Sequence, residues 1–187
     1  MNRIILASAS PRRRELMALA GYDFEVICAD INETVPKNAA PEDVVKSLAL
    51  QKAQAVAENH SDAVVVGSDT VVALDGKILG KPHSEREAAE MLRLLSGRKH
   101  KVYTGVAIVC GEKVKNFFDE TDVEFYPLSD AEIEAYVATG EPMDKAGSYG
   151  IQGKGALLVK GISGDYFNVM GLPISKVYRE MRDFLAE

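Results

Sequence analysis

The chain has 187 residues, of which 47% are hydrophobic and 27% are charged, and its formal net charge is −6. These values are ordinary for a folded protein, and the length supports one domain, residues 1–187, with a core of its own. The negative charge argues against a nucleic-acid binder that works by bulk electrostatics, because such proteins are usually basic.

The first predicted strand, Ile4 to Ala7, leads through a short turn into a predicted helix, Pro11 to Ala20. Ser10 suits the N-cap position, and Pro11 suits the first helical position, where a missing N–H has no cost. Arginines 12–14 then place three positive charges in a helical turn whose dipole favours anions. The junction therefore predicts an anion site, with phosphate as the leading ligand. A solvated basic turn is the alternative.

The next predicted elements are a short strand over residues 24–28, a polar loop and a helix from Pro41 to about Asn59. Two apolar runs follow, residues 63–66 and 71–74, and a polar interruption over residues 67–70 separates them. We expect the first run to be a buried strand that ends at this interruption. The second run begins a predicted hairpin, because Asp-Gly supplies its turn.

The second half of the chain predicts helices and long strands in alternation. Ser84 with Glu87, and Ser129 with Glu132, are spaced as capping boxes that open two helices. The remaining predictions are strands over 102–110, 114–126 and 156–160, and a last helix after Pro173 with the apolar stripe Ile174, Val177, Tyr178, Met181 and Leu185. Together these elements predict an α/β fold with a mixed sheet flanked by helices.

Further features of the sequence concern the compartment. Cys28 and Cys110 are far apart and form no CxxC pair, which is typical of free thiols in a reducing cytosol. The N-terminal residues lack the pattern of a secretory signal, and no apolar stretch approaches the ~20 residues of a membrane span. We therefore expect a soluble, cytoplasmic protein with no membrane partner.

Several charged side chains conflict with their local setting, and these are candidates for chemistry. Lys52 shares a helical stripe with apolar residues, and Asp69 follows a core strand, where open α/β sheets bind ligands. Glu33 lies in a polar loop, and Lys81 lies between Gly80 and Pro82. Three have an ordinary alternative: snorkelling for Lys52, a structural turn for Asp69, and solvation for Glu33. Lys81 is a weak signal on its own. His60, His83 and His100 show no metal-ligand spacing, so we expect them at the surface.

Taken together, these residues suggest metal-assisted phosphate chemistry. The cations at Arg12, Arg13, Lys52 and Lys81 suit a polyphosphate, and the carboxylates at Glu33 and Asp69 suit Mg²⁺ or Mn²⁺.

The same residues also resemble a known family. The matching segments are Ser8–Arg13 with Glu15 and Leu16, Gly67–Val72, Gly80–Pro82, Tyr103–Gly105 and Tyr149–Gly153. In order and spacing they resemble the Maf family of nucleoside triphosphate pyrophosphatases, whose fold is like that of the inosine triphosphatases and has a central cleft.

The resemblance implies that a nucleoside triphosphate is hydrolysed between its α and β phosphates. It implies Asp69 as proton acceptor, Glu33 and Lys81 as further catalytic residues, Ser8, Arg13, Lys52 and Lys81 on phosphates, and Glu33 with Asp69 on Mg²⁺ or Mn²⁺. It implies Arg12, Thr70 and Gln152 as the residues that select dTTP and UTP. It also implies removal of non-canonical nucleotides and a link to septum formation and cell division arrest. Members of the family often form homodimers, which the sequence of this chain does not show by itself.

Two alternatives stay open at this point. One is a non-catalytic nucleotide or nucleic-acid binding regulator of septum formation. The other is a pyrophosphatase for purine or modified bases.

Overall fold

The computed structural model of the chain describes residues 3–35 and 38–186. Within them a seven-stranded mixed sheet has the order β2-β1-β3-β5-β6-β7, and β4 pairs with β3 beside this path. The strands are β1 (Ile4–Ala7), β2 (Glu25–Val26), β3 (Val64–Leu74), β4 (Lys77–Leu79), β5 (Lys99–Cys110), β6 (Lys113–Phe125) and β7 (Val159–Ser163). The predicted mixed sheet flanked by helices is confirmed.

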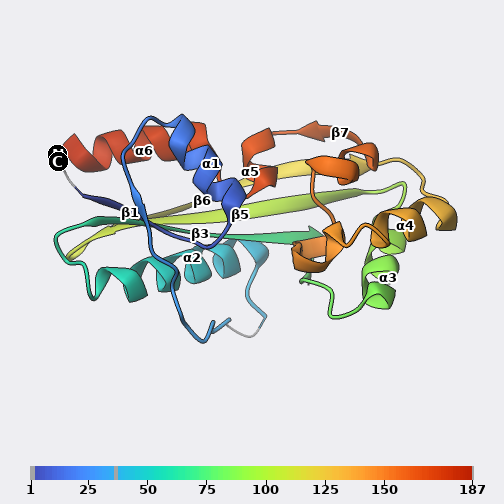
Figure 1. Ribbon diagram of the computed structural model, residues 1–187, viewed down its shortest axis with the longest axis horizontal. Helices are drawn as coiled ribbons and strands as arrows, with labels where there is room; N and C mark the ends of the chain where they lie inside the picture. The colour runs from blue at the N-terminus through green and yellow to red at the C-terminus, as the bar shows by residue number, and fades with distance from the viewer. Residues whose placement is uncertain (1–2, 36–37, 187) are drawn as a thin grey trace.

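The helices cover both faces and one end of this sheet (Figure 1). They are α1 (Pro11–Leu19), α2 (Pro41–Ala57), α3 (Glu85–Leu95), α4 (Asp130–Val137), α5 (Tyr166–Met170) and α6 (Ile174–Ala186), with 3-10 turns η1 (Glu141–Asp144), η2 (Ala146–Ser148) and η3 (Gly153–Leu157). α1 and α6 lie on one face, α2 lies on the other, and α3 with α4 cover the far end. None of the helices in the described part of the chain is long and apolar enough to cross a membrane.

The alternation of side chains along β1 explains how one short strand serves both faces. Ile4 and Leu6 pack in a cluster with buried residues of α1 and α6, whereas Ile5 and Ala7 pack in a cluster with α2. All four residues are buried. A strand that is buried on both faces reads as a continuous apolar run, which is why this strand is recognisable from the sequence.

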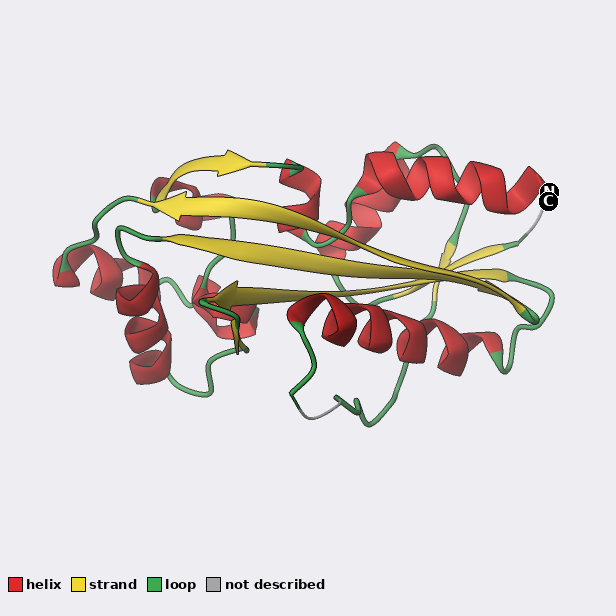
Figure 2. Cartoon of the chain, turned by 180° about the vertical axis from the view of Figure 1, so that it is seen from behind, coloured by secondary structure: helices red, strands yellow, loops and turns green. Residues whose placement is uncertain are grey.

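One expectation is wrong at the polar interruption. Residues 64–74 form one continuous strand, so Asp69 lies in the middle of β3 and not beyond the end of a core strand. Asp69 pairs with Gly105 and Thr70 pairs with Thr104 in the antiparallel ladder with β5. The ladder continues because its hydrogen bonds join backbone groups, whatever the side chains are. Figure 2 shows the long twisted strands that result.

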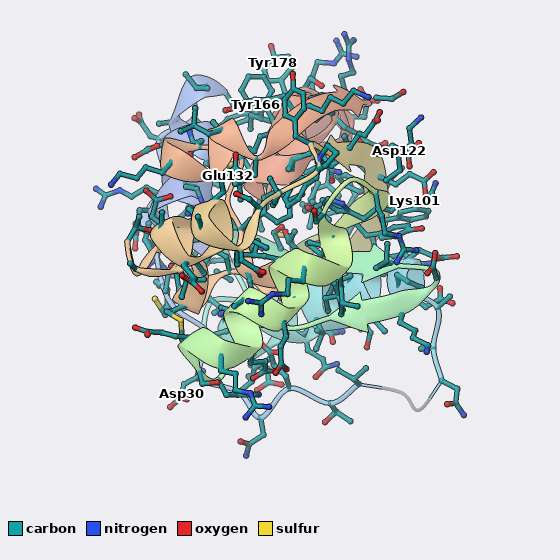
Figure 3. All side chains as sticks on the ribbon, turned by 90° about the vertical axis from the view of Figure 1, so that its right-hand side faces the viewer. Asp30, Lys101, Asp122, Glu132, Tyr166 and Tyr178 are labelled. Atoms are coloured by element: carbon teal, nitrogen blue, oxygen red, sulfur yellow. The ribbon has the colours of Figure 1, made fainter. Side chains whose placement is uncertain are left out.

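Some local predictions also need correction. Ser84 does cap α3, but the Glu87 carboxylate accepts from the backbone N–H of His83, so the reciprocal bond of a capping box is not formed there. The strand predicted at 156–160 begins only at Val159. Tyr178 of the predicted apolar stripe is exposed and is labelled at the surface in Figure 3. Phe184, which the predicted stripe omits, is buried on α6.

Candidate active site

A gap in the sheet exposes the middle of β3. β1 pairs with β3 as far as Ala7 opposite Gly67, and β4 pairs with β3 from Val72 onward. Among the strands of residues 3–35 and 38–186, residues 68–71 of β3 therefore have β5 on one side and no partner on the other. Because β1 runs parallel and β4 antiparallel to β3, the chain leaves both strands at this gap. The chain leaves β1 at Ser8 and β4 at Gly80, the residue before Lys81.

A cavity of about 530 Å³ opens at this gap, a volume typical of small-molecule sites. Eight of the nine predicted site residues line it: Ser8, Arg12, Arg13, Lys52, Asp69, Thr70, Lys81 and Gln152. The ninth, Glu33, reaches the same place through an ion pair with Lys52. The structure thus brings together residues that lie far apart in the sequence, and what each of them does there stays a prediction.

The turn between β1 and α1 forms as its sequence indicates. Ser10 has an extended backbone conformation, and its side chain accepts a hydrogen bond from the backbone N–H of Arg13. Pro11 begins the helix, and its first turn contains no acidic residue. Ser8 is buried, and its hydroxyl oxygen accepts from the backbone N–H of Ser10 at 3.2 Å. The N-terminal end of α1 therefore faces the cavity, and no carboxylate of its own first turn neutralises the positive end of the helix dipole.

Arg13 turns inward and bonds to the protein itself. Its guanidinium donates to the carbonyl oxygens of Gly171 at 2.8 Å and Ser68 at 2.7 Å, and to the hydroxyl of Thr70 at 2.9 Å. Burial lowers the pKa of Arg13, while the charge of Asp69 acts in the opposite direction. A guanidinium has five N–H donors, so two of them stay available to a ligand in the cavity.

Two carboxylates from separate elements converge on one ammonium. The Lys52 Nζ lies 2.5 Å from Asp69 Oδ1 and 2.8 Å from Glu33 Oε1. The side chains of Lys52 and Asp69 are only 17% and 14% exposed, whereas Glu33 is 46% exposed. Lys52 therefore points into the cavity and does not snorkel to the surface. One of its three N–H donors is left for a further partner.

The meeting of Glu33 and Asp69 fits the chemistry of a magnesium or manganese ion. Such ions prefer oxygen ligands and are often held by one or two carboxylates together with substrate phosphates. The structure already places a cation, the Lys52 ammonium, between these two carboxylates. No group of three or more His, Cys, Asp or Glu in the described residues could hold an ion by itself. The two carboxylates therefore suit an ion whose further ligands are phosphate oxygens of a substrate.

Consecutive residues of β3 serve opposite faces of the sheet. Asp69 faces α2, where it meets Lys52. Ser68 and Thr70 face the other way: the Ser68 hydroxyl donates to the Gly171 carbonyl at 3.1 Å, and Thr70 accepts from Arg13. Since the gap leaves this edge of β3 open, one cavity reaches side chains of both faces.

Three of the predicted residues keep unengaged side chains at the cavity. Within the described part of the chain, Arg12, Lys81 and Gln152 make no side-chain hydrogen bond or ion pair, and all three line the cavity. A guanidinium, an ammonium and an amide are thus available to a ligand, and the amide can both donate and accept.

The segment Tyr149–Gly153, which lies at the cavity, is anchored by buried polar side chains. Tyr136 accepts a hydrogen bond from the Gly150 N–H, and burial raises its pKa to about 12. Tyr149 lies 2.7 Å from the Nε2 of His100, and burial raises the pKa of Tyr149. His100 itself is only 3% exposed, which corrects its expected surface position, and burial lowers its pKa to about 4. Tyr149 and the Gly150 backbone are thereby held in place.

Two cavity residues, Asp144 and Lys145, were missed by the sequence analysis. The Lys145 ammonium donates to the Glu141 carbonyl at 2.6 Å and to the Asp144 carboxylate at 2.7 Å. Burial acts to raise the pKa of Asp144, but the bond from Lys145 and the charges of Lys145 and Arg12 bring it below its usual value. Adjacent charges in a polar segment look solvated in a sequence, so no local signal marked this pair.

The chain is similar to proteins of one family over nearly its whole length. A family model described as "Maf-like protein" matches residues 3–184. A protein of Bacillus cereus (strain AH820) named "dTTP/UTP pyrophosphatase" is 57% identical over 184 residues, which cover 98% of this chain and 96% of the relative. A protein of the same name from Bacillus mycoides (strain KBAB4) has the same identity and coverage. The solved structure of the Staphylococcus aureus Ham1 protein is 17% identical, with a TM-score of 0.47, and the match covers 66% of this chain and 71% of that one.

Proposed function

Since the chain belongs to the Maf family, we propose that it is an enzyme that hydrolyses dTTP and UTP to the nucleoside monophosphate and pyrophosphate. The observation that carries the proposal is the convergence of Glu33, Lys52 and Asp69 in one cavity with the basic turn after β1. The names of the relatives, which are 57% identical, supply the substrates.

In this proposal the phosphates lie along the cations of the gap. Ser8, Arg13, Lys52 and Lys81 hold phosphate oxygens, Arg13 through its two remaining N–H groups and Lys52 through its third. Such fixed donors stabilise negative charge that develops on phosphate oxygens. They also hold the α–β anhydride in place beside the carboxylates, which lowers the entropic cost of reaching the reactive geometry.

Asp69 is the proton acceptor for the attacking water in this proposal. The water oxygen forms a bond to phosphorus, the α–β anhydride bond breaks, pyrophosphate leaves, and the water proton passes to the Asp69 carboxylate. Glu33 and Asp69 would hold Mg²⁺ or Mn²⁺, which when bound neutralises charge on the phosphates. Lys52 keeps the two carboxylates oriented toward each other, and Lys81 approaches from the opposite side of the gap.

Base selection falls to three other side chains that line the cavity. We propose that Arg12, Thr70 and Gln152 contact the pyrimidine. The Gln152 amide can donate to and accept from a pyrimidine edge.

Several further expectations, some from length and composition and others from the family resemblance, are proposed with it. They are one functional domain over residues 1–187, action in the cytoplasm without nucleic acid, a homodimer, and removal of non-canonical nucleotides with a link to septum formation. Two alternatives to the main proposal remain testable: a non-catalytic regulator, and a pyrophosphatase for purine or modified bases. A pair of carboxylates in a phosphate site disfavours the first, because a pure anion binder gains nothing from them without a metal.

The proposal is tested with purified protein, Mg²⁺ or Mn²⁺, and a panel of canonical and modified triphosphates. We expect pyrophosphate release from dTTP and UTP above the other triphosphates. Asp69→Asn keeps the size of the side chain but removes its basicity, so we expect the rate to fall at least ~10²-fold while nucleotide binding persists. Asp75→Asn in the exposed β3–β4 turn is the matched control and retains full activity.

The outcomes separate the three functions. Faster release from purine or modified triphosphates would favour the second alternative. Binding without release from any triphosphate would favour the regulator. An unchanged rate for Asp69→Asn would remove Asp69 from the chemistry.

A further inference from the structure

A chain of hydrogen bonds connects the cavity wall to the buried middle of α5. Thr70 Oγ1 lies 2.9 Å from Thr104 Oγ1 on the neighbouring strand, and Thr104 Oγ1 lies 2.9 Å from the backbone carbonyl oxygen of Asn168. At the other end, the Arg13 guanidinium donates to Thr70 at 2.9 Å. Thr104 and Asn168 are both fully buried, at 0% exposure. This chain is separate from the carboxylates and ammonium on the other face of β3.

The chemistry of the two ends determines where each hydroxyl hydrogen lies. A carbonyl oxygen can only accept, so the single hydrogen of Thr104 points to Asn168. That carbonyl also accepts from the Gly171 N–H, and its two lone pairs accommodate both bonds. Thr104 therefore has no hydrogen left for Thr70, and Thr70 must donate to Thr104.

The remaining capacity of Thr70 follows from this order. A hydroxyl has one hydrogen and two acceptor sites. The hydrogen of Thr70 goes to Thr104, and one acceptor site receives the Arg13 N–H. One acceptor site is left, and Thr70 lines the cavity. A ligand atom that bonds to Thr70 must consequently carry a hydrogen of its own.

Uracil and thymine meet this requirement, and cytosine in the same pose does not. The middle position of the pairing edge is an N3–H donor in uracil and thymine, whereas in cytosine it is an N3 acceptor. If Thr70 can only accept, its oxygen receives a hydrogen bond from the N3–H of uracil or thymine. Against the N3 of cytosine, two lone pairs face each other and no hydrogen bond forms. A site built to receive a hydrogen rejects an analogue that lacks it, because its own polar group is left unpaired.

We propose that Thr104 is a positioning residue that turns the Thr70 hydroxyl into an obligate acceptor and so selects uracil and thymine over cytosine. The proposal rests on the proposed function, in which Thr70 contacts the base. The neighbouring Gly171 limits what can stand beside the Thr70 hydroxyl. Gly171 has a φ of 110°, and a Cβ on it would lie 3.3 Å from Arg13 Nε and 3.4 Å from Thr70 Oγ1, so a side chain there would crowd both.

The test is the ratio of kcat/KM for UTP to kcat/KM for CTP in Thr104→Val. Valine has nearly the same shape as threonine but cannot accept, so the Thr70 hydrogen is released to donate to cytosine N3. We expect the UTP to CTP ratio to fall by about 3- to 10-fold, the range that one hydrogen bond spans. Thermal unfolding shows whether the valine variant is folded. If it is poorly folded, Thr104→Ala replaces it, and we expect the same fall in the ratio.

Three controls separate positioning from a general structural effect. Thr104→Ser restores the hydroxyl and should restore the ratio. Thr121→Val removes another buried hydroxyl, one that donates to the Asp165 carbonyl and accepts from Asn168 Nδ2 but bonds to neither Thr70 nor Thr104. It should leave the ratio unchanged. In a Thr70→Val background, Thr104→Val should no longer change the ratio, because its effect passes through Thr70.

Failure of this proposal is distinct from failure of the proposed function. A wild-type protein that releases no pyrophosphate from UTP refutes the function. An active wild type whose ratio stays within twofold in Thr104→Val refutes the positioning role. Equal losses for UTP and CTP refute it as well.

Discussion

At the scale of the residue, three consecutive arginines have three different environments. The sequence marks all of them as one basic turn, yet Arg12 stays unengaged at the cavity, Arg13 bonds to the protein, and Arg14 is exposed. The difference follows from helix geometry, since neighbouring residues point about 100° apart. Arg13 is the one that meets β3 and the Gly171 turn, so it joins three parts of the fold at the cavity.

Arg13→Lys tests this joining role. A lysine retains the charge but replaces the planar fork with a single ammonium, so two of the three bonds are lost. We expect a loss of about 3 kcal/mol in the free energy of unfolding, from about 1.5 kcal/mol or more for each charged bond. Urea unfolding measures the loss, and pyrophosphate release should fall with it. Arg14→Lys is the matched control and should change neither; a fully stable Arg13→Lys would contradict the role.

At the scale of the element, the position of α2 depends on two glycines of the sheet. A Cβ on Gly105 would overlap the backbone of Val45, and a Cβ on Gly67 would overlap the backbone of Ala49. The helix backbone therefore lies directly on β3 and β5. Gly105 is also the residue paired with Asp69. This close approach is what brings Lys52 on α2 within reach of the Asp69 carboxylate.

Gly105→Ala tests the close approach. The added methyl must push α2 away, and we expect a loss of about 1–3 kcal/mol in the free energy of unfolding. The pyrophosphatase rate should fall by a larger factor than the stability loss alone explains, because Lys52 moves away from Asp69. Gly161→Ala on β7, where a Cβ meets nothing within 4 Å, is the control and should stay within ~0.5 kcal/mol of wild type. Normal stability and rate in Gly105→Ala would contradict the argument.

At the scale of the whole molecule, long strands carry separate hydrophobic clusters on either side of the cavity. One cluster packs α1 and α6 on the sheet near β1, and another packs α3 and α4 near the β3–β4 hairpin. At the latter end, Figure 3 shows Lys101 and Asp122 on adjacent strands, where their ion pair measures 3.7 Å. His100 lies inside this end, edge-on to Phe125 and Tyr149.

The buried His100 makes the stability of the molecule depend on pH. Its pKa is lowered to about 4 in the folded protein, from about 6.5 when unfolded. Between these values the unfolded chain binds a proton that the folded protein does not, so stability falls as the pH drops from 6.5 to 4. The shift corresponds to about 3 kcal/mol.

The measurement is urea unfolding at pH 7 and pH 4.5 for wild type and His100→Gln. The variant cannot take up the proton, so its loss of stability on acidification should be smaller than that of wild type. His83→Gln removes an exposed histidine and should behave like wild type. Equal acid sensitivity in all three proteins would show that His100 does not control the effect.

The sequence by itself determined the elements whose signals are local. The Ser10 cap with Pro11, the Asp-Gly hairpin and the Ser129–Glu132 capping box all form as predicted. Each depends on groups within a few residues of one another, so the local sequence is sufficient to predict it. The mixed sheet with flanking helices follows from the order of these elements.

Only the tertiary structure decided the details of the site. The sequence indicated an interruption at residues 67–70, but the ladder with β5 made it a continuous strand with Asp69 and Thr70 on opposite faces. It also turned Lys52 inward and buried His100. The physical reason is that a side chain's direction, burial and proton order are set by partners distant in the sequence. The direction of the Thr70 hydroxyl depends on Thr104 and Asn168, which no local pattern connects to it.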